Sequence, residues 1–246
     1  MSKRVAVVTG GMGGLGTAIC KTLAQAGRTV IAADLPPSDD RLAEFRNRIG
    51  DADIHFIAVD VADHASCDAL VAQVKREFGS LDILVNNAGI TRDATLRKMD
   101  PVQWQAVLDV NLGGAFHLSR HAIDGMLSRG FGRIANISSI SGQTGNFGQT
   151  NYAAAKAGLH GFTMSLAREV ASKGITVNSI SPGYVETPMT QAMPPEVRAR
   201  TVASVPVGRI GAPDDIARAV AFLTDDAASY ITGANLPVNG GLFMSF

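Results

Sequence analysis

The stretch that decides the fold is Val5-Ala-Val-Val-Thr9-Gly10-Gly11-Met12-Gly13-Gly14-Leu15-Gly16. In it a short apolar, β-branched run meets a glycine-rich turn, and the segment 17–26 that follows has helical periodicity. Glycine permits positive φ angles and lets the backbone approach a ligand closely. The free N–H groups and the positive dipole end of a helix bind anions. This strand–turn–helix pattern predicts that Gly10 to Gly16 hold the pyrophosphate of a dinucleotide.

The second apolar run, 29–34, ends in an acid, Asp34. A carboxylate at this point can accept hydrogen bonds from the adenosine ribose hydroxyls, and it repels a 2′-phosphate. Asp34 therefore favours NAD(H). NADP(H) is kept as the alternative cofactor, because Arg41 is near enough in sequence to fold back onto a phosphate. An ordinary role for Asp34 in capping the next turn also stays open.

Seven short apolar runs alternate with longer amphipathic stretches; the runs span 5–9, 29–34, 54–59, 81–86, 133–138, 175–180 and 235–238. Apolar strands that alternate with helices are typical of a parallel sheet covered on both faces. The prediction is one α/β domain over residues 1–246, with a doubly wound, Rossmann-type parallel sheet of about seven strands. The stretch 183–211, which contains four prolines, is predicted to be a substrate lid with a short helix near 195–202.

Composition argues against several classes of protein. The chain has 246 residues, of which 46% are hydrophobic and 18% charged, with 22 basic and 22 acidic side chains. This balance argues against nucleic-acid binding, which needs a basic surface, and weakly favours self-association. The two cysteines, Cys20 and Cys67, lack a metal-ligand spacing, and the N-terminal apolar run is too short for a signal peptide or a membrane span. We expect a cytoplasmic protein that holds no metal.

A pair of side chains that can share a proton lies one helical turn apart, namely Tyr152 and Lys156 in the helical stretch 151–172. A phenol titrates near pH 10, too high for acid–base work at neutral pH. An ammonium alongside stabilises the phenolate and lowers the phenol pKa. The pair is therefore predicted to donate a proton to a carbonyl oxygen that receives hydride.

More polar side chains are predicted at the same edge of the sheet. Ser139 follows a strand, and its hydroxyl can hydrogen-bond a carbonyl oxygen on which negative charge develops. Ser138 and Ser141 compete for this role, and only spacing favours Ser139. The fourth strand leads into Asn86-Asn-Ala-Gly89. Asn111 lies in a helical stretch, where asparagine is mildly unfavourable, which indicates a specific hydrogen bond.

These residues resemble the short-chain dehydrogenase/reductase family over 5–241, in the family's order. The resemblance implies that Tyr152 is the general acid/base and that Lys156 binds the nicotinamide ribose while lowering the tyrosine pKa. It also implies that Ser139 polarises the carbonyl and that Asn111 holds a water of the proton relay. The family is commonly tetrameric, so a homotetramer is expected. Further cofactor contacts implied by position are Asp60, Val61, Asn87, Ala88, Gly89, Pro182, Gly183, Val185 and Thr187.

A narrower resemblance is to bacterial acetoacetyl-CoA reductases of the polyhydroxybutyrate pathway, carried by Asn86-Asn-Ala-Gly-Ile-Thr-Arg-Asp93, by Phe147-Gly-Gln-Thr-Asn-Tyr152 and by the segment 155–164. It implies NAD(P)H-dependent reduction of a 3-oxoacyl thioester, most simply acetoacetyl-CoA to (R)-3-hydroxybutyryl-CoA. Asp34 departs from that pattern, because the best-known members use NADPH. The implied substrate contacts are Asp93, Ser139, Phe147, Gln149, Tyr152 and Tyr184.

Two alternatives stay open. The related 3-oxoacyl-acyl-carrier-protein reductases share most of these motifs, and Arg92, Arg97 and Lys98 suit either an acidic carrier protein or the phosphate of an adenine nucleotide. A non-catalytic dinucleotide sensor is the alternative from another class, because a fold does not guarantee its chemistry.

Two remaining features predict contacts between subunits. His117 and His121 have i, i+4 spacing but no obvious third ligand, so they are interpreted as interface or solvated residues. The tail 240–246 is unusually apolar for a chain end, and we expect it to be buried against a neighbouring subunit.

Overall fold

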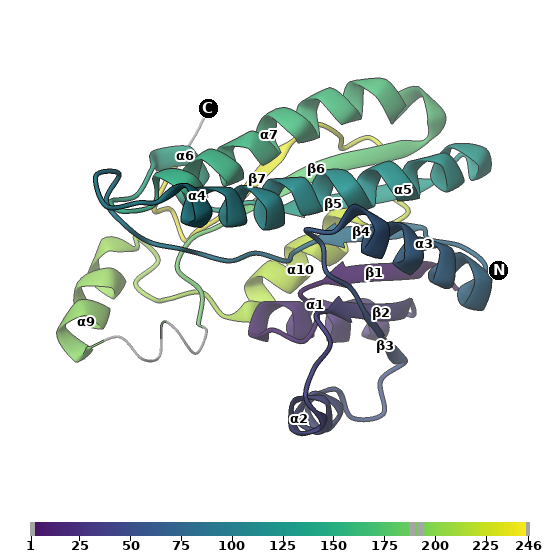
Figure 1. The fold of residues 1–246 in the computed structure, drawn as a ribbon, viewed down its shortest axis with the longest axis horizontal. Helices are drawn as coiled ribbons and strands as arrows, with labels where there is room; N and C mark the ends of the chain where they lie inside the picture. The colour runs from purple at the N-terminus through teal and green to yellow at the C-terminus, as the bar shows by residue number, and fades with distance from the viewer. Residues whose placement is uncertain (1–2, 187–189, 191–193, 245–246) are drawn as a thin grey trace.

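The computed structural model describes residues 3–186, 190 and 194–244. Within them, seven strands form one sheet in the order β3-β2-β1-β4-β5-β6-β7, and each neighbouring pair is parallel (Figure 1). The predicted α/β class and strand number are confirmed. The strands are β1 (Val5–Thr9), β2 (Thr29–Asp34), β3 (Ile54–Ala58), β4 (Ile83–Asn86), β5 (Gly132–Ile137), β6 (Ile175–Pro182) and β7 (Asn235–Val238).

Helices connect the strands, and none of those in the described part of the chain is long and apolar enough to cross a membrane. They are α1 (Gly14–Gln25), α2 (Asp39–Ile49), α3 (His64–Phe78), α4 (Pro101–Leu108), α5 (Gly114–Arg129), α6 (Ser141–Thr144), α7 (Thr150–Val170), α9 (Pro195–Ser204) and α10 (Pro213–Leu223), with a π-helical segment η1 (Asp109–Gly113) and a 3₁₀ segment η2 (Ala171–Lys173).

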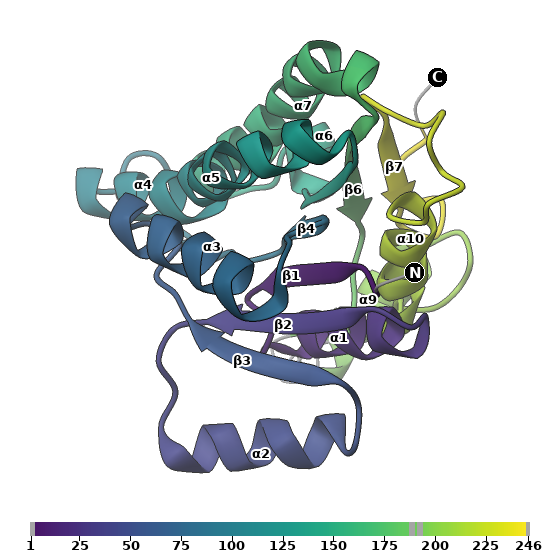
Figure 2. The ribbon, with the colours of Figure 1, turned by 90° about the vertical axis from the view of Figure 1, so that its right-hand side faces the viewer.

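The sheet has an apolar core on each face, and Figure 2 shows the helices that lie on its two sides. Along β1, Val5 and Val7 pack into the core that α3, α5 and α7 cover. Ala6 and Val8 pack into the opposite core with α1, α2 and α10. Because side chains of a strand alternate between the faces, a strand covered on both sides reads as a continuous apolar run. This is why the strands could be recognised in the sequence.

The order of the strands reverses at β1, which lies between β2 and β4. In open parallel sheets, ligands bind in the crevice at the carboxyl ends of the strands beside such a reversal. The glycine turn follows β1 at this edge. Helix α9 lies beyond the same edge, at the left of Figure 1, and contains the short helix predicted near 195–202.

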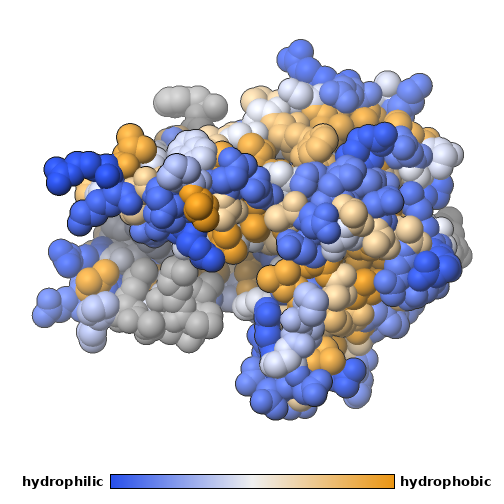
Figure 3. All heavy atoms as spheres, viewed as in Figure 1, coloured by the Kyte–Doolittle hydropathy of each residue, from blue (hydrophilic) through white to orange (hydrophobic). Residues whose placement is uncertain are grey.

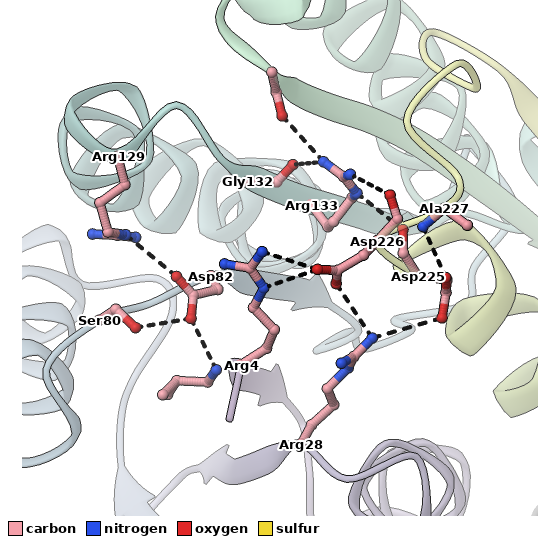
Figure 4. A network of polar contacts seen from close by, with 12 residues as sticks. Arg4, Arg28, Ser80, Asp82, Arg129, Gly132, Arg133, Asp225, Asp226 and Ala227 are labelled. Carbon is pink, nitrogen blue, oxygen red and sulfur yellow. Dashed lines mark hydrogen bonds and ion pairs between the residues drawn. The ribbon is translucent and has the colours of Figure 1, made fainter. Parts of the chain in front are cut away.

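At the opposite edge, a buried arginine ties the start of β5 to distant loops (Figure 4). Arg133 is 2% exposed, and its guanidinium donates hydrogen bonds of 2.9–3.1 Å to main-chain carbonyls of Gly132, Gly174, Asp225 and Asp226. Arg4 forms an ion pair of 2.9 Å with the Asp226 carboxylate. Burial lowers the pKa of Arg133, because it penalises the charged form of the guanidinium. The hydrogen bonds and the nearby carboxylate of Asp226 offset this cost.

Candidate active site

The glycine turn after β1 packs so closely that side chains are excluded. A Cβ atom on Gly11 would stand 2.7 Å from the Ala32 Cα, and one on Gly16 would overlap the Gly10 carbonyl. Gly10 has φ +61°, a left-handed conformation that favours glycine. Gly14, where α1 begins, is exposed, and a Cβ there would meet no atom within 4 Å. The turn therefore presents the N-terminus of α1 to open space, as a pyrophosphate site requires.

The end of β4 holds this turn in place. The side-chain amide of Asn87 donates to the Thr9 carbonyl at 2.8 Å, and the backbone N–H groups of Asn87 and Ala88 both donate to the Thr9 hydroxyl at 2.9 Å. The sequence predicted Asn87 as a ribose contact. Its amide donates to the turn in the structure, and its contact with a ribose stays a prediction.

Asp34 ends β2 beside the turn, and its carboxylate is already hydrogen-bonded. It accepts from the backbone N–H of Met12 at 3.1 Å and of Leu35 at 2.9 Å, and it lies 3.4 Å from the guanidinium of Arg41. Arg48 donates to the Met12 carbonyl at 2.8 Å. Asp34 thus pairs with Arg41 beside the glycine turn, and Arg48 contacts the same turn at Met12.

Lys156 is almost fully buried in the first half of α7, at 3% exposure. Its ammonium donates to the Ile137 carbonyl at 2.7 Å, at the end of β5. Burial lowers the lysine pKa to about 8. The same ammonium lies 5.6 Å from the ring centre of Tyr152, so the two side chains share one face of the helix as predicted.

The pKa of Tyr152 differs from the sequence-based expectation. Lys156 was expected to lower it, whereas in the structure the pKa of Tyr152 is raised. Burial of the phenol is the largest cause; a hydrogen bond from the Ser139 side chain opposes it, and the negative charge of Asp93 adds to it. The prediction of a lowered pKa was wrong, because desolvation penalises phenolate more than nearby groups favour it.

Asn111 lies in η1, where the predicted helix widens into a π-helical turn, a feature often found at functional sites. Its amide donates to the carbonyls of Ile90 at 2.9 Å and Val107 at 2.8 Å. Its Oδ1 atom is buried and accepts no hydrogen bond from the described residues. A Cβ atom on Gly89 would stand 2.6 Å from this oxygen and 3.5 Å from the Lys156 ammonium, so the three residues meet.

The comparison with known proteins identifies the family. A family model described as enoyl-(acyl carrier protein) reductase matches residues 10–243. The chain belongs to the short-chain dehydrogenase/reductase family. Membership implies a nicotinamide dinucleotide cofactor, and the tight glycine turn with its exposed helix N-terminus fits one.

Relatives in the short-chain dehydrogenase/reductase family align over nearly the whole chain. An acetoacetyl-CoA reductase of Allochromatium vinosum is 55% identical over 98% of this chain and 99% of its own length. An acetoacetyl-CoA reductase of Cupriavidus necator is 50% identical, over 99% and 100%. A 3-oxoacyl-acyl-carrier-protein reductase of Escherichia coli is 47% identical, over 98% of each chain.

The remaining sequence-predicted residues lie around the same edge. Pro182 ends β6, Gly183 donates its N–H to the Val238 carbonyl at 3.1 Å, and Val185 forms an isolated bridge with Gly211. Thr187 lies outside the described residues. Asp60 accepts a hydrogen bond from the backbone N–H of Ala62, and Val61 is buried beside Gly114. Tyr184 is partly exposed, and Phe147 is 89% exposed.

Sequence reasoning missed a polar layer behind Lys156. The Ser138 hydroxyl donates to the Lys156 main-chain carbonyl at 2.8 Å and lies 2.8 Å from His160 Nε2. The amide of Asn86 donates to Asn136 at 2.8 Å, inside the sheet. The available signal was an asparagine in the middle of an apolar strand, since a buried polar group needs a partner.

The described residues contain no group of three or more histidine, cysteine or acidic side chains that could hold a metal ion. His121 instead lies 3.1 Å from Asp68, and the His117 ring lies 3.0 Å from the Val61 carbonyl.

Proposed function

We propose that this protein is an NAD(P)H-dependent reductase of 3-oxoacyl thioesters, which converts acetoacetyl-CoA to (R)-3-hydroxybutyryl-CoA. The observation that carries the proposal is the meeting of Ser139, Tyr152 and Lys156 at the carboxyl edge of the sheet, beside the glycine turn. The same chain is 55% and 50% identical to two acetoacetyl-CoA reductases over almost their full lengths. A non-catalytic sensor has no need of this set of side chains.

Each side chain has a role that follows from its surroundings. When bound, the nicotinamide supplies the hydride. A phenol is protonated at neutral pH, so Tyr152 carries the proton that the reduced oxygen takes up. The hydrogen bond from the Ser139 side chain favours the phenolate that remains. Ser139 hydrogen-bonds the same oxygen as negative charge develops on it. Lys156 holds the nicotinamide ribose, and the free Oδ1 of Asn111 accepts from a water of the proton relay.

The cofactor is proposed to lie along the residues that the sequence indicated, and NADH is proposed to be preferred. A carboxylate beside the adenosine ribose would accept hydrogen bonds from its hydroxyls and repel a 2′-phosphate, and this is the role proposed for Asp34. Arg41, 3.4 Å from Asp34, gives such a phosphate one cation to contact. NADPH is therefore expected to be used with a lower kcat/KM. The proposed contacts are Gly10 to Gly16, Asp34, Asp60, Val61, Asn87, Ala88, Gly89, Tyr152, Lys156, Pro182, Gly183, Val185 and Thr187.

The acyl group is proposed to enter between the loop after β4 and the segment before α7. Asp93 and Gln149 line this entrance and are hydrogen-bonded to each other at 3.0 Å. Phe147 and Tyr184 are proposed to contact the pantetheine arm. Phe147 is 89% exposed and Tyr184 38% exposed, so both are accessible to a substrate. The segment 183–211, which carries α9, is proposed as the lid that closes over the substrate.

Acyl-carrier-protein thioesters are the second candidate substrate. The relative from Escherichia coli that bears this activity in its name is 47% identical. Arg92, Arg97 and Lys98 are exposed beside the entrance, where they can receive an acidic carrier protein or the phosphates of CoA.

A homotetramer is proposed from the exposed apolar side chains of three helices. Val102 of α4 is 77% exposed, and Phe116 of α5 and Met164 of α7 are about half exposed. Apolar residues lie among the polar ones on the face shown in Figure 3. Burial of such side chains against a second copy would stabilise an assembly.

The test is steady-state reduction of acetoacetyl-CoA, with NADH and NADPH in parallel. Wild-type protein should turn over with NADH, and Tyr152→Phe should lose on the order of a thousandfold in kcat while it still binds NADH. Tyr230→Phe is the matched control, because Tyr230 is fully exposed. Turnover of the carrier-protein thioester alone would favour the second candidate. An equal loss of activity and cofactor binding in Tyr152→Phe would contradict the role of Tyr152.

A further inference from the structure

A chain of hydrogen bonds links an acid at the entrance to the proposed site of reaction. The side-chain amide of Gln149, just before α7, donates to the Asp93 carboxylate at 3.0 Å. The Ser141 hydroxyl donates to the Gln149 carbonyl oxygen at 3.2 Å, and the Ser141 N–H donates to the Ser139 hydroxyl at 3.1 Å. Asn146 also donates to Gln149, at 3.0 Å. Asp93 is thus fixed relative to Ser139 and Tyr152.

The charge of Asp93 is not neutralised by this arrangement. Its side-chain partner is a neutral amide, and no basic side chain within residues 3–186, 190 and 194–244 forms an ion pair with it. Its field reaches the phenol of Tyr152, because it contributes to the raised pKa of that group. Asp93 is also exposed, so the same field meets a substrate as it enters.

The substrates that this field separates differ only in the group at C1. In a 3-oxoacyl thioester C1 is neutral, whereas in a free 3-oxo acid it is a carboxylate. C1 is two bonds from C3, the carbonyl carbon that must stand beside Ser139 and Tyr152. Because the Asp93 charge acts on the phenol of Tyr152, it also acts on a carboxylate at C1 of a substrate bound beside that phenol, and like charges repel. The phosphates of a CoA carrier lie farther out, where Arg92, Arg97 and Lys98 are exposed.

We propose that Asp93 is a specificity-determining residue, whose negative charge, held in place by Gln149, rejects free 3-oxo acids and admits neutral 3-oxoacyl thioesters. This inference rests on the proposed function, since it names what the same site excludes. Asparagine at this position can still accept the hydrogen bond from Gln149, so Asp93→Asn removes the charge and leaves the contact in place.

The experiment compares acetoacetate, an anion, with ethyl acetoacetate, a neutral ester that lacks a CoA arm. The ratio of kcat/KM for acetoacetate to that for ethyl acetoacetate should rise about tenfold in Asp93→Asn, as expected for one unit charge at short range near the surface. The inhibition constant of acetoacetate against the ester should fall by a similar factor. Asp93→Glu should keep the wild-type ratio. Asp124→Asn, which removes an equal charge from the outer surface of α5, is the matched control.

Salt provides a readout that a merely structural role would not change. Raising the ionic strength from about 0.01 M to 1 M should weaken the discrimination in wild-type protein and not in Asp93→Asn. An unchanged ratio and inhibition constant in Asp93→Asn would overturn the proposal, and so would the same change in Asp93→Glu. Failure of the wild type to reduce acetoacetyl-CoA, its carrier-protein equivalent and the ester would instead overturn the proposed function.

Discussion

Lys156 makes the stability of this protein depend on pH. Burial lowers the pKa of its ammonium from 10.5 to about 8. Between these two values the unfolded chain binds more protons than the native protein, so the free energy of unfolding rises as the pH rises. Below about pH 8 both states carry the charge, and the full unfavourable effect of its burial is present.

Lys156→Met removes this dependence, because methionine has a similar length and no charge. The difference between 10.5 and about 8 corresponds to about 3 kcal/mol when the lysine is charged in both states. Between pH 7 and pH 10 the wild type should gain about 2 to 3 kcal/mol of stability relative to the variant. The lost hydrogen bond to Ile137 changes the stability difference mainly by an amount that does not vary with pH. The variant should also lose activity, because it cannot hold the nicotinamide ribose.

The assay is urea unfolding at several pH values between 7 and 10, followed by the fluorescence of Trp104, the single tryptophan of the chain. Lys173→Met, at an exposed position after α7, shows the effect of removing a surface lysine. A stability difference between wild type and Lys156→Met that stays constant from pH 7 to pH 10 would refute the reasoning. A wild type that loses stability relative to the variant as the pH rises would also refute it.

Three further substitutions test other parts of the structure. Arg133→Met removes four hydrogen bonds to main-chain carbonyls and should lower the free energy of unfolding in urea by about 3 to 5 kcal/mol. A loss below about 1 kcal/mol would show that the stability of the fold does not depend on this network. Gly16→Ala should abolish NADH binding in a fluorescence titration, because its Cβ would overlap the Gly10 carbonyl. Gly161→Ala is the control, since a Cβ there on α7 meets no atom within 4 Å and binding should be normal. Normal binding by Gly16→Ala would contradict the close packing of the turn. Arg41→Ala should raise the ratio of the NADPH to the NADH dissociation constant about tenfold, because Asp34 loses its cation; an unchanged ratio would assign Arg41 no part in cofactor choice.

The strands could be predicted because each is buried on both faces. β1, β2 and β7 have the predicted bounds, and the other four differ by at most two residues at either end. The i, i+4 spacing placed Tyr152 and Lys156 on one helix face, and both lie there. These features depend on local periodicity, which a sequence carries directly.

The unpredicted features depend on contacts between distant segments. Asn111 lies in a π-helical turn that no local pattern indicated. The amide of Asn87 binds the glycine turn, because β4 and β1 are neighbours in the sheet. The pKa of Tyr152 is raised because its burial outweighs its neighbours, and burial at one position depends on the whole fold. The pairing of Asp34 with Arg41 likewise requires the three-dimensional course of the chain after β2.

Isotope transfer tests the central claim most directly, namely hydride transfer to C3 of a 3-oxoacyl thioester with Tyr152 as the proton donor. Acetoacetyl-CoA would be reduced with NADH that carries deuterium at C4, in each of its two stereochemical forms, and the product analysed by mass spectrometry. One form should give 3-hydroxybutyryl-CoA with one deuterium at C3, and Tyr152→Phe should give almost no product with either. Unlabelled product from both forms, or labelled product from Tyr152→Phe at the wild-type rate, would contradict the claim.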